Sequence, residues 1–367
     1  MKYNWQQDDW PIFRYNSEDF DSLNLEFSEK IGRIGGLLDA LPEGMQTDTL
    51  IDIMVSEAIK TSEIEGEYLS RPEVLSSIRN NLGLNKRLEQ IKDQRASGIA
   101  ELMICLRDEW NKPLSQTMLF NWHTLVMRGS IRVNSGAWRT HQEAMQVISG
   151  PIGSETVHFE ACPSSHVPGE MKRFIKWFND TAPGGQQEIR WAPVRAAIAH
   201  VYFESIHPFE DGNGRIGRAV AEKALSQGIG RPILLSLSQS IEHDRAGYYE
   251  ALKQGQRSNE VTPWIVWFTG TLINAQKEVE EKIEFTLKKT RLFNRVQDQL
   301  NERQLKVLRR MLKEGPAGFK GGMTAKKYIA ITGAAKATAT RDLQEMVRAE
   351  VFIPSGGGRS VSYQVTL

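Results

Sequence analysis

The segment between His207 and Arg218 holds the side chains with the clearest chemical use. It reads His-Pro-Phe-Glu-Asp-Gly-Asn-Gly-Arg-Ile-Gly-Arg and connects two helical patterns. Gly212 and Gly214 let backbone N–H groups approach an anion closely, and the N–H groups at the start of the following helix add positive potential. Arg215 and Arg218 are three residues apart, so both project from one side of that helix toward phosphate oxygens. The pattern predicts an anion-binding loop.

Two further residues of the segment have types that take part in reactions. Histidine ordinarily titrates near neutral pH, so the neutral form of His207 can accept a proton. Asp211 offers hard oxygen ligands beside the anion-binding loop, which suits Mg²⁺. Taken singly, each residue has an ordinary structural explanation as a turn, a surface charge or a helix-end histidine. Their concentration within 12 residues favours a phosphate site with one metal ligand and one base.

The elements that must position this segment are mainly helical. Apolar residues recur with helical spacing over most of the chain. Asp48 can cap the helix that follows it, and a further helix starts at Arg71-Pro72. The predicted helices span about 23–41, 48–66, 88–110, 115–128, 169–179, 192–206, 214–227, 242–255 and 262–293. Between about Glu143 and Glu160 the pattern alternates instead, which predicts a β-hairpin. The edge of a hairpin can pair with an incoming peptide, and a packed hairpin without function is the alternative.

Length and composition indicate a soluble protein of more than one domain. At about 150 residues per domain, 367 residues correspond to two or three domains. The 40% hydrophobic and 25% charged residues are typical of globular chains, and two cysteines exclude a disulfide scaffold or a four-thiolate zinc site. No apolar stretch approaches the length of a membrane span, and Met1–Asn4 leads into polar sequence. We expect a cytoplasmic protein without membrane association.

The net charge of +1 hides a division along the chain. Residues 286–367 contain 16 Lys+Arg against 6 Asp+Glu, a net charge of +10, whereas the rest of the chain carries −9. A basic module indicates contact with polyanions, and a solvated lysine-rich surface is the alternative. The same part of the chain predicts three helices followed by two strands, at about 301–313, 324–329, 337–349, 351–353 and 361–365. That order is typical of a winged helix.

The segment 207–218 resembles the motif of the Fic-domain family, His-Pro-Phe-x-(Asp/Glu)-Gly-Asn-Gly-Arg-x-x-Arg, at every specified position. The resemblance covers about residues 115–260. It implies a mainly α fold, with a Fic helical core, a β-hairpin flap and a C-terminal winged helix-turn-helix domain. The implied division is an N-terminal helical region over 1–110, a catalytic core over 111–290 and a winged-helix domain over 291–367.

Fic proteins of this kind transfer AMP from ATP to a hydroxyl side chain of a target protein. The resemblance implies that His207 is the general base, that Asp211 holds Mg²⁺ against the α- and β-phosphates, and that Arg218 meets the γ-phosphate. It assigns the remaining phosphate contacts to Gly212, Asn213, Gly214 and Arg215. Tyr248 and Tyr249 lie where related proteins contact the adenosine, and packing in the core is the alternative for both tyrosines.

A second, shorter motif resembles the inhibitory segment of the same family. Thr61-Ser62-Glu63-Ile64-Glu65-Gly66 fits the pattern (Ser/Thr)-x-x-x-Glu-(Gly/Asn). The resemblance implies that Glu65, at the end of the predicted helix 48–66, enters the nucleotide site and pairs with Arg218. A carboxylate there competes with the γ-phosphate for the same guanidinium. A solvated acidic helix end is the alternative.

The resemblance also bears on partners. It implies ATP and Mg²⁺ as cofactors, a protein substrate docked along the flap, modification of Ser, Thr or Tyr with the chain itself as one target, and by analogy a homodimer. Removal of AMP and phosphocholine transfer stay open at the same site. The alternative from another functional class is a DNA-binding regulator. In that hypothesis Lys336 and Arg341 face phosphates and Arg359 enters a minor groove. His200 is expected in the core.

Overall fold

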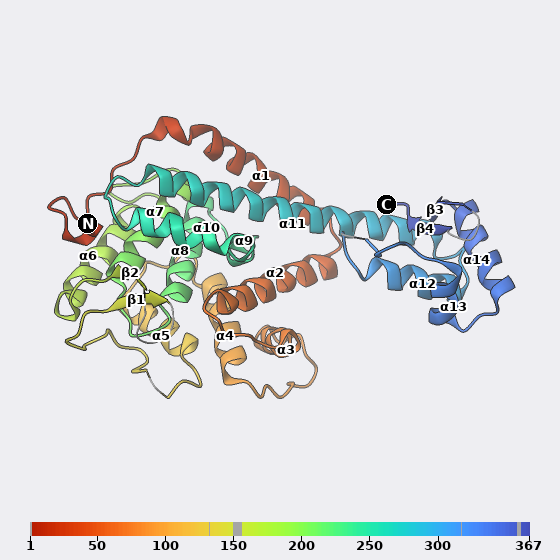
Figure 1. The fold of residues 1–367 in the computed structure, drawn as a ribbon, viewed down its shortest axis with the longest axis horizontal. Coiled ribbons are helices and arrows are strands. Elements are labelled where there is room, and N and C mark those ends of the chain that lie inside the picture. The colour runs from red at the N-terminus through yellow and green to blue at the C-terminus, as the bar shows by residue number, and fades with distance from the viewer. Residues whose placement is uncertain (1, 132, 150–155, 317, 358–360) are drawn as a thin grey trace. The chain divides into compact units, whose positions relative to one another are not determined.

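The computed structural model describes all residues except 1, 132, 150–155, 317 and 358–360. The described residues form fourteen α-helices and two two-stranded sheets, which confirms the predicted mainly helical fold. They divide into two units (Figure 1), one of residues 1–35 and 42–277 and one of residues 36–41 and 278–367. The three-domain division expected from the resemblance stays a prediction.

The first unit contains most of the helices and the flap hairpin. Its elements, two of which also contribute residues to the second unit, are η1 (Asn4–Gln6), η2 (Ser17–Asp19), α1 (Asp21–Asp39), α2 (Glu43–Ile64), α3 (Arg71–Asn81), α4 (Gln94–Asp108), α5 (Gln116–Val126), β1 (Gln146–Ser149), β2 (Thr156–Glu160), η3 (Ser164–His166), α6 (Val167–Asp180), α7 (Ala192–Ile206), α8 (Asn213–Ile229), α9 (Leu237–His243), α10 (Arg245–Gly255) and α11 (Thr262–Val296).

Helix α7 is the centre of the first unit. All of its residues are buried. Apolar side chains occur on every face of α7, which is typical of a helix that other elements cover on all sides. It packs against α6 and α8, and Figure 1 shows α7, α8 and α10 beside one another. The buried Arg195 joins α7 to α6 and α8. Its guanidinium donates to the carbonyl of Phe178 in α6 at 2.7 Å and to the side chain of Gln227 in α8 at 2.9 Å.

Three predicted helices differ from the structure by several residues. The helix predicted over 88–110 begins only at Gln94, because the side chain of Asp93 accepts from the N–H of Arg95 and caps it there. The helix predicted from about residue 48 begins at Glu43, directly after Pro42, whose ring restricts φ in front of the first turn. Asp48 is therefore not a cap but an internal residue of the helix, and its exposed carboxylate lies 3.5 Å from Arg79. The helix predicted over 242–255 begins at Arg245, and residues 237–243 form a separate helix, α9, that was not predicted. Asp244 separates α9 from α10 and caps α10, since its side chain accepts from the backbone N–H of Gly247.

The predicted hairpin lies where the alternating pattern placed it. Strands β1 and β2 are antiparallel, with Gln146 opposite Glu160 and Ser149 opposite Thr156. The register shifts between Val147 and Ile148, where β2 contains one extra residue. The turn expected between the strands falls largely on 150–155, outside the described residues.

The second unit folds around its own apolar core. It contains α12 (Glu302–Leu312), α13 (Ala325–Thr332), α14 (Lys336–Arg348), β3 (Phe352–Ser355) and β4 (Ser362–Val365). Buried Asp342 of α14 accepts from Tyr328 of α13 at 2.9 Å and pairs with Arg303 of α12 at 3.0 Å, so one carboxylate ties three helices together. The order of elements is that of the predicted winged helix, which itself stays a prediction.

The residues proposed for DNA contact lie on α14 or outside the described chain. Lys336 begins α14 and is exposed, and Arg341 lies one turn later with its side chain 65% exposed. Arg359 belongs to the residues that the structure does not describe.

Within the described ranges, no helix combines the length and the apolar composition needed to cross a lipid bilayer.

Candidate active site

The loop between α7 and α8 carries the predicted site. Helix α7 ends at Ile206, and His207 follows with φ 51° and ψ 61°, in the left-handed region that residues other than glycine rarely adopt. Gly212 precedes α8 with φ 80°, which a glycine tolerates without strain. A histidine in this conformation costs about 1–3 kcal/mol. The surrounding structure must therefore hold His207 in place.

Arg139 provides this support. It is 1% exposed, and its guanidinium donates to the carbonyls of His207 at 2.7 Å and Ile206 at 3.2 Å. The same side chain donates to Ser164 Oγ at 2.8 Å and to the carbonyl of Cys162, in the segment after the flap. Burial lowers the pKa of the Arg139 guanidinium from its ordinary value. Arg139 thus caps the last carbonyls of α7 and fixes the backbone of the candidate base.

Two buried side chains hold the loop from inside. The amide of Asn213 bonds both backbone groups of Phe209 at 2.9 Å. The ring of His123 stacks on Phe209 with centroids 4.0 Å apart. Its Nδ1 accepts from the N–H of Gly136, so Nε2 donates to the carbonyl of Asp211 at 3.2 Å. Burial lowers the pKa of His123 to about 4, so the ring is neutral at physiological pH. Asn213 can meet an anion only through its backbone N–H.

The end of α2 lies against the second motif arginine. Arg218 is 1% exposed and pairs with Glu65 at 2.8 Å. Its guanidinium also donates to the hydroxyl and the carbonyl of Thr61, each at 2.8 Å. Burial lowers the pKa of Arg218, but Glu65, Tyr248 and Glu204 together outweigh burial, and the net direction is upward. A Cβ at Gly214 would overlap the Glu65 carboxylate, so glycine gives the carboxylate its room.

The first motif arginine is neutralised by the same segment. Arg215 is 3% exposed and pairs with Glu67 at 2.8 Å, while Asp211 lies 3.7 Å away. The Asp211 side chain is 57% exposed and accepts from the N–H of Gly212 at 2.6 Å. No cluster of three or more potential metal-ligating side chains occurs among the described residues. A single exposed carboxylate beside an anion-binding loop fits Mg²⁺ that is bound mainly by substrate phosphates.

A cavity of about 570 Å³ opens beside the loop, a volume suited to a small ligand. It is bounded by the end of α2, the flap, α7, the start of α8 and α10. The predicted residues His207, Gly214, Tyr248, Tyr249 and Glu65 all line it. The structure therefore brings the candidate base, the anion-binding loop, the two tyrosines and the α2 glutamate around one space.

The two tyrosines occupy different environments. Tyr248 is 2% exposed, and its hydroxyl lies 3.3 Å from Nε2 of His200, which is in the core as expected. Tyr249 is 40% exposed and donates its hydroxyl to the carbonyl of Ile64 at 3.3 Å. Burial raises the pKa of both hydroxyls and lowers that of His200 to about 4. All three side chains are neutral near pH 7, and Tyr249 also contacts the end of α2.

The N-terminal segment supports the flap. The indole of Trp5 donates to the carbonyl of Glu160 at 2.7 Å, and the ring of Tyr3 meets Phe159 edge-on at 5.0 Å. Asn4 is fully buried and donates to the hydroxyl of Ser205 in α7 at 2.8 Å. Since Phe159 lines the cavity, these contacts fix the flap strand β2 relative to the loop after α7.

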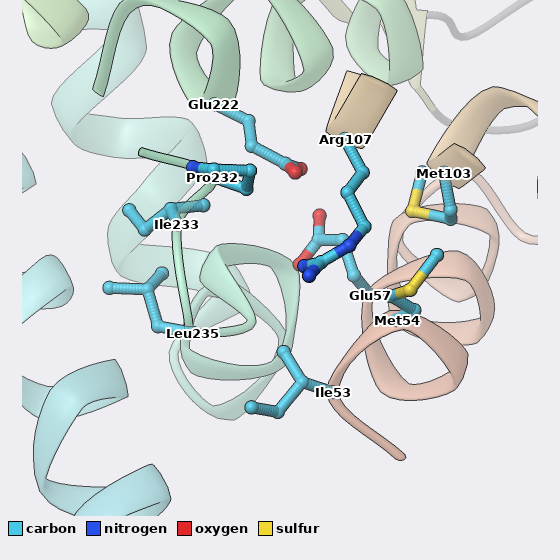
Figure 2. A pocket seen from close by; sticks show the side chains of 9 residues that line it. All are labelled: Ile53, Met54, Glu57, Met103, Arg107, Glu222, Pro232, Ile233 and Leu235. Carbon is cyan, nitrogen blue, oxygen red and sulfur yellow. The ribbon is translucent and has the colours of Figure 1, made fainter. Parts of the chain in front are cut away.

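A second, small pocket shows how α2 is held (Figure 2). Glu57 of α2 accepts from the hydroxyl and N–H of Ser238 and from the hydroxyl of Ser236, at the start of α9. Glu222 of α8 and Arg107 of α4 line the same pocket, and Figure 2 shows the carboxyl group of Glu222 and the guanidinium of Arg107 pointing into it. Burial, with the Glu57 carboxylate nearby, raises the pKa of Glu222 to about 8. Glu222 therefore keeps its proton at neutral pH.

Three supporting residues were not found from the sequence. Arg139 and His123 lie far from the motif along the chain, so nothing in the sequence connects them with it. Glu204, which also lines the cavity, left a weak signal: it precedes His207 by three residues and therefore shares its face of α7.

Replacing Arg139 by Ala is expected to lower the free energy of unfolding of the first unit by about 3 kcal/mol. The reason is that several buried carbonyls lose their donor. Urea unfolding followed by tryptophan fluorescence measures this, since all nine tryptophans belong to the first unit. Arg128→Ala is the control, because Arg128 forms a partly exposed pair with Glu101 and should cost about 1 kcal/mol or less. Equal losses in the two variants would contradict the capping role.

Glu222→Gln is expected to flatten the pH dependence of stability. Between the ordinary value of 4.5 and about 8, folded Glu222 holds a proton that the unfolded chain releases, so wild-type stability falls as pH rises through this range. Glutamine cannot ionise and removes that fall. Unfolding free energies from pH 5 to pH 9 measure the effect, with Glu101→Gln as an exposed control. A variant curve parallel to wild type would show that Glu222 ionises normally.

Comparisons with known proteins place this geometry in a family. Residues 113–225 match the model described as Fic/DOC family, and residues 3–84 match a domain of unknown function, DUF4172. The chain is 25% identical to the protein adenylyltransferase Fic of Drosophila ananassae over 167 residues, which are 43% of this chain and 31% of that protein. It is 31% identical to the protein of the same name from Nematostella vectensis over 105 residues, 28% of this chain and 23% of that one.

Solved structures with a similar fold include a protein described as Fic family. A Fic family protein from Desulfovibrio desulfuricans superposes with a TM-score of 0.53 at 21% identity, covering 94% of this chain and 96% of the other. The chain spans less than a third of the length of the curated relatives it matches. The motif at 207–218 lies within the matched range, and the protein therefore contains a Fic domain.

Proposed function

We propose that this protein is an adenylyltransferase, which transfers AMP from ATP to a hydroxyl side chain of a protein, itself included. The observation that carries the proposal is the joint placement of His207 and Gly214, at the N-terminus of α8, around one cavity whose lining residue Glu65 pairs with Arg218. The relatives named protein adenylyltransferase support the reaction class over their matched part.

The anion-binding groups at α8 suit a triphosphate. Backbone N–H groups in the first turn of a helix have no partner within the helix, and the helix dipole favours negative charge there. Within the described chain, Nη1 of Arg218 and Nε of Arg215 make no hydrogen bond, so both arginines keep a donor for phosphate oxygens. Magnesium held by Asp211 and the phosphates would supply charge neutralisation. Tyr248 and Tyr249 then border the space left for the nucleoside.

The reaction needs positioning more than covalent help from the protein. A target segment pairs with the flap edge and presents a Ser, Thr or Tyr hydroxyl to the cavity. His207 takes the hydroxyl proton, the oxygen attacks the α-phosphorus in line, and pyrophosphate leaves. The backbone N–H groups of α8 and the arginines stabilise the charge on the phosphates. Removal of AMP uses the same groups and stays an alternative direction.

Glu65 makes the described arrangement an inhibited one in this proposal. Its carboxylate occupies the guanidinium of Arg218 and the space above Gly214, where the γ-phosphate is expected. Two anions cannot share this position without repulsion. Glu65 must therefore leave before ATP binds productively. Because Glu65 directly follows α2, motion at the end of that helix is sufficient.

The test of the activity is transfer of label from ATP to protein. ATP labelled at the α-phosphate is expected to label the protein or its target, whereas ATP labelled at the γ-phosphate is not. His207→Ala should abolish the label, because the hydroxyl then lacks its proton acceptor. His166→Ala is the matched control, since His166 is exposed and lies outside the cavity. Label from the γ-phosphate, or full labelling by His207→Ala, would exclude this mechanism.

Glu65→Gly is expected to raise the rate of automodification by roughly tenfold or more, the scale on which coupled sites influence each other. The variant frees Arg218 for the γ-phosphate. Incorporation of AMP is followed by intact-protein mass spectrometry. Glu63→Gly makes the same change two residues earlier, where the carboxylate pairs with Lys60 instead, and should leave the rate near that of wild type. Equal rates for Glu65→Gly and wild type would remove the inhibitory role.

A further inference from the structure

A buried carboxylate lies behind the candidate base. Glu204 is 4% exposed and precedes His207 by three residues on α7. Its Oε2 lies 3.6 Å from Nδ1 of His207. Within the described chain, neither Nδ1 of His207 nor Oε1 of Glu204 has a hydrogen-bond partner. A carboxylate is costly to bury without compensation, so its presence here calls for an explanation.

The surroundings keep Glu204 close and charged. Arg218 of α8, Tyr248 of α10 and His200 of α7 are the other titratable groups that interact with it. Burial raises the pKa of Glu204, but His207, His200 and Arg218 together outweigh burial and lower it. The carboxyl group is therefore ionised at neutral pH.

Helix α8 leaves room for this carboxylate at one position. A Cβ built at Gly217 would overlap Oε1 of Glu204, so a side chain there would displace the carboxylate. Gly217 is one of the three unspecified positions of the motif and lies between Arg215 and Arg218. The glycine is thus explained by contact with Glu204 and not by contact with a nucleotide.

The imidazole of His207 has two sides. Nδ1 is the nitrogen next to Glu204, and the ring also lines the cavity. Besides Glu204, the titratable or charged groups that line the cavity are Glu65, His158, Arg245, Tyr248 and Tyr249. A neutral imidazole carries its proton on one nitrogen, and the hydrogen bond made by that nitrogen decides which tautomer is present.

We propose that Glu204 is a positioning residue for His207, accepting a hydrogen bond from Nδ1–H and thereby leaving Nε2 unprotonated toward the cavity. When the target hydroxyl gives its proton to Nε2, the oxygen bonds to the α-phosphorus and pyrophosphate departs with the bond electrons. The imidazolium that forms is stabilised by the adjacent carboxylate. The inference rests on the proposed function for its role in transfer, whereas the pairing itself is a property of the chain.

The first test is the tautomer of His207, measured by ¹⁵N NMR of the full chain without nucleotide. Wild type is expected to show the Nδ1–H form. In Glu204→Gln the side-chain amide can donate to Nδ1, so the Nε2–H form should increase. The matched control is Glu170→Gln, a buried glutamate of α6 that pairs with Arg173 and accepts from Trp10. An unchanged His207 tautomer in Glu204→Gln would overturn the pairing.

The second test is kinetic and uses the Glu65→Gly background. Glu204→Gln should lower kcat by roughly tenfold to a hundredfold, part of the 10²–10⁴-fold that a general base contributes, with the KM for ATP changed by less than about threefold. The acidic limb of the kcat/KM profile should lie at lower pH, since an imidazolium without a neighbouring carboxylate loses its proton more readily. Unchanged kcat and profile would overturn the positioning role.

Gly217→Ala gives an independent variant, because it displaces the carboxylate and keeps Glu204 in the sequence. The same tautomer and kcat changes are expected, and circular dichroism verifies that both variants are folded. If either variant is unfolded, the other decides. A tautomer change in the variants, together with no transfer of AMP by Glu65→Gly itself, would overturn the proposed function and leave the pairing established.

Discussion

The candidate site depends on one electrostatic constraint: two buried guanidinium groups each require a negatively charged partner. Arg215 and Arg218 project from the first turns of α8 and are almost fully buried. A buried charge without a partner is strongly destabilising, so some anion must occupy this position in every stable state. In the described state the partners are Glu67 and Glu65, from the segment that follows α2. In the proposed function a triphosphate satisfies the same need, so the α2 segment and the nucleotide compete for the same two guanidinium groups.

Buried hydrogen bonds hold the loop that carries the candidate base. His207 keeps an unfavourable backbone conformation because Arg139 binds the carbonyl groups of the peptide bonds before and after it. His123 and the amide of Asn213 close the loop from inside. The candidate base and the anion-binding turn are thus fixed independently of the α2 segment. Movement of Glu65 at the end of α2 therefore need not disturb His207 or the anion-binding turn.

Local signals in the sequence predicted the elements well. Helix α7 begins and ends where its apolar pattern does, and the hairpin lies where alternation replaced helical spacing. Errors arose where two signals compete. Asp48 has the type of a cap, yet the helix starts earlier, after Pro42. Asp244 lies inside a continuous apolar pattern, and its capping bond to Gly247 divides that pattern into two helices. The motif located the loop, but the sequence could not reveal Arg139 or His123, which reach it through tertiary contacts.

The glycines of α8 carry a consequence for the stability of that helix. Gly214 and Gly217 lie in its first turns, where glycine costs about 1 kcal/mol each in helix propensity relative to alanine. Elsewhere, replacing a helical glycine by alanine is a common route to a more robust protein. Here the methyl group would evict Glu65 from one position and Glu204 from the other. The helix therefore keeps glycine, a weak helix former, at both positions. Its lower helix propensity is the cost of the close packing of two carboxylates against its backbone.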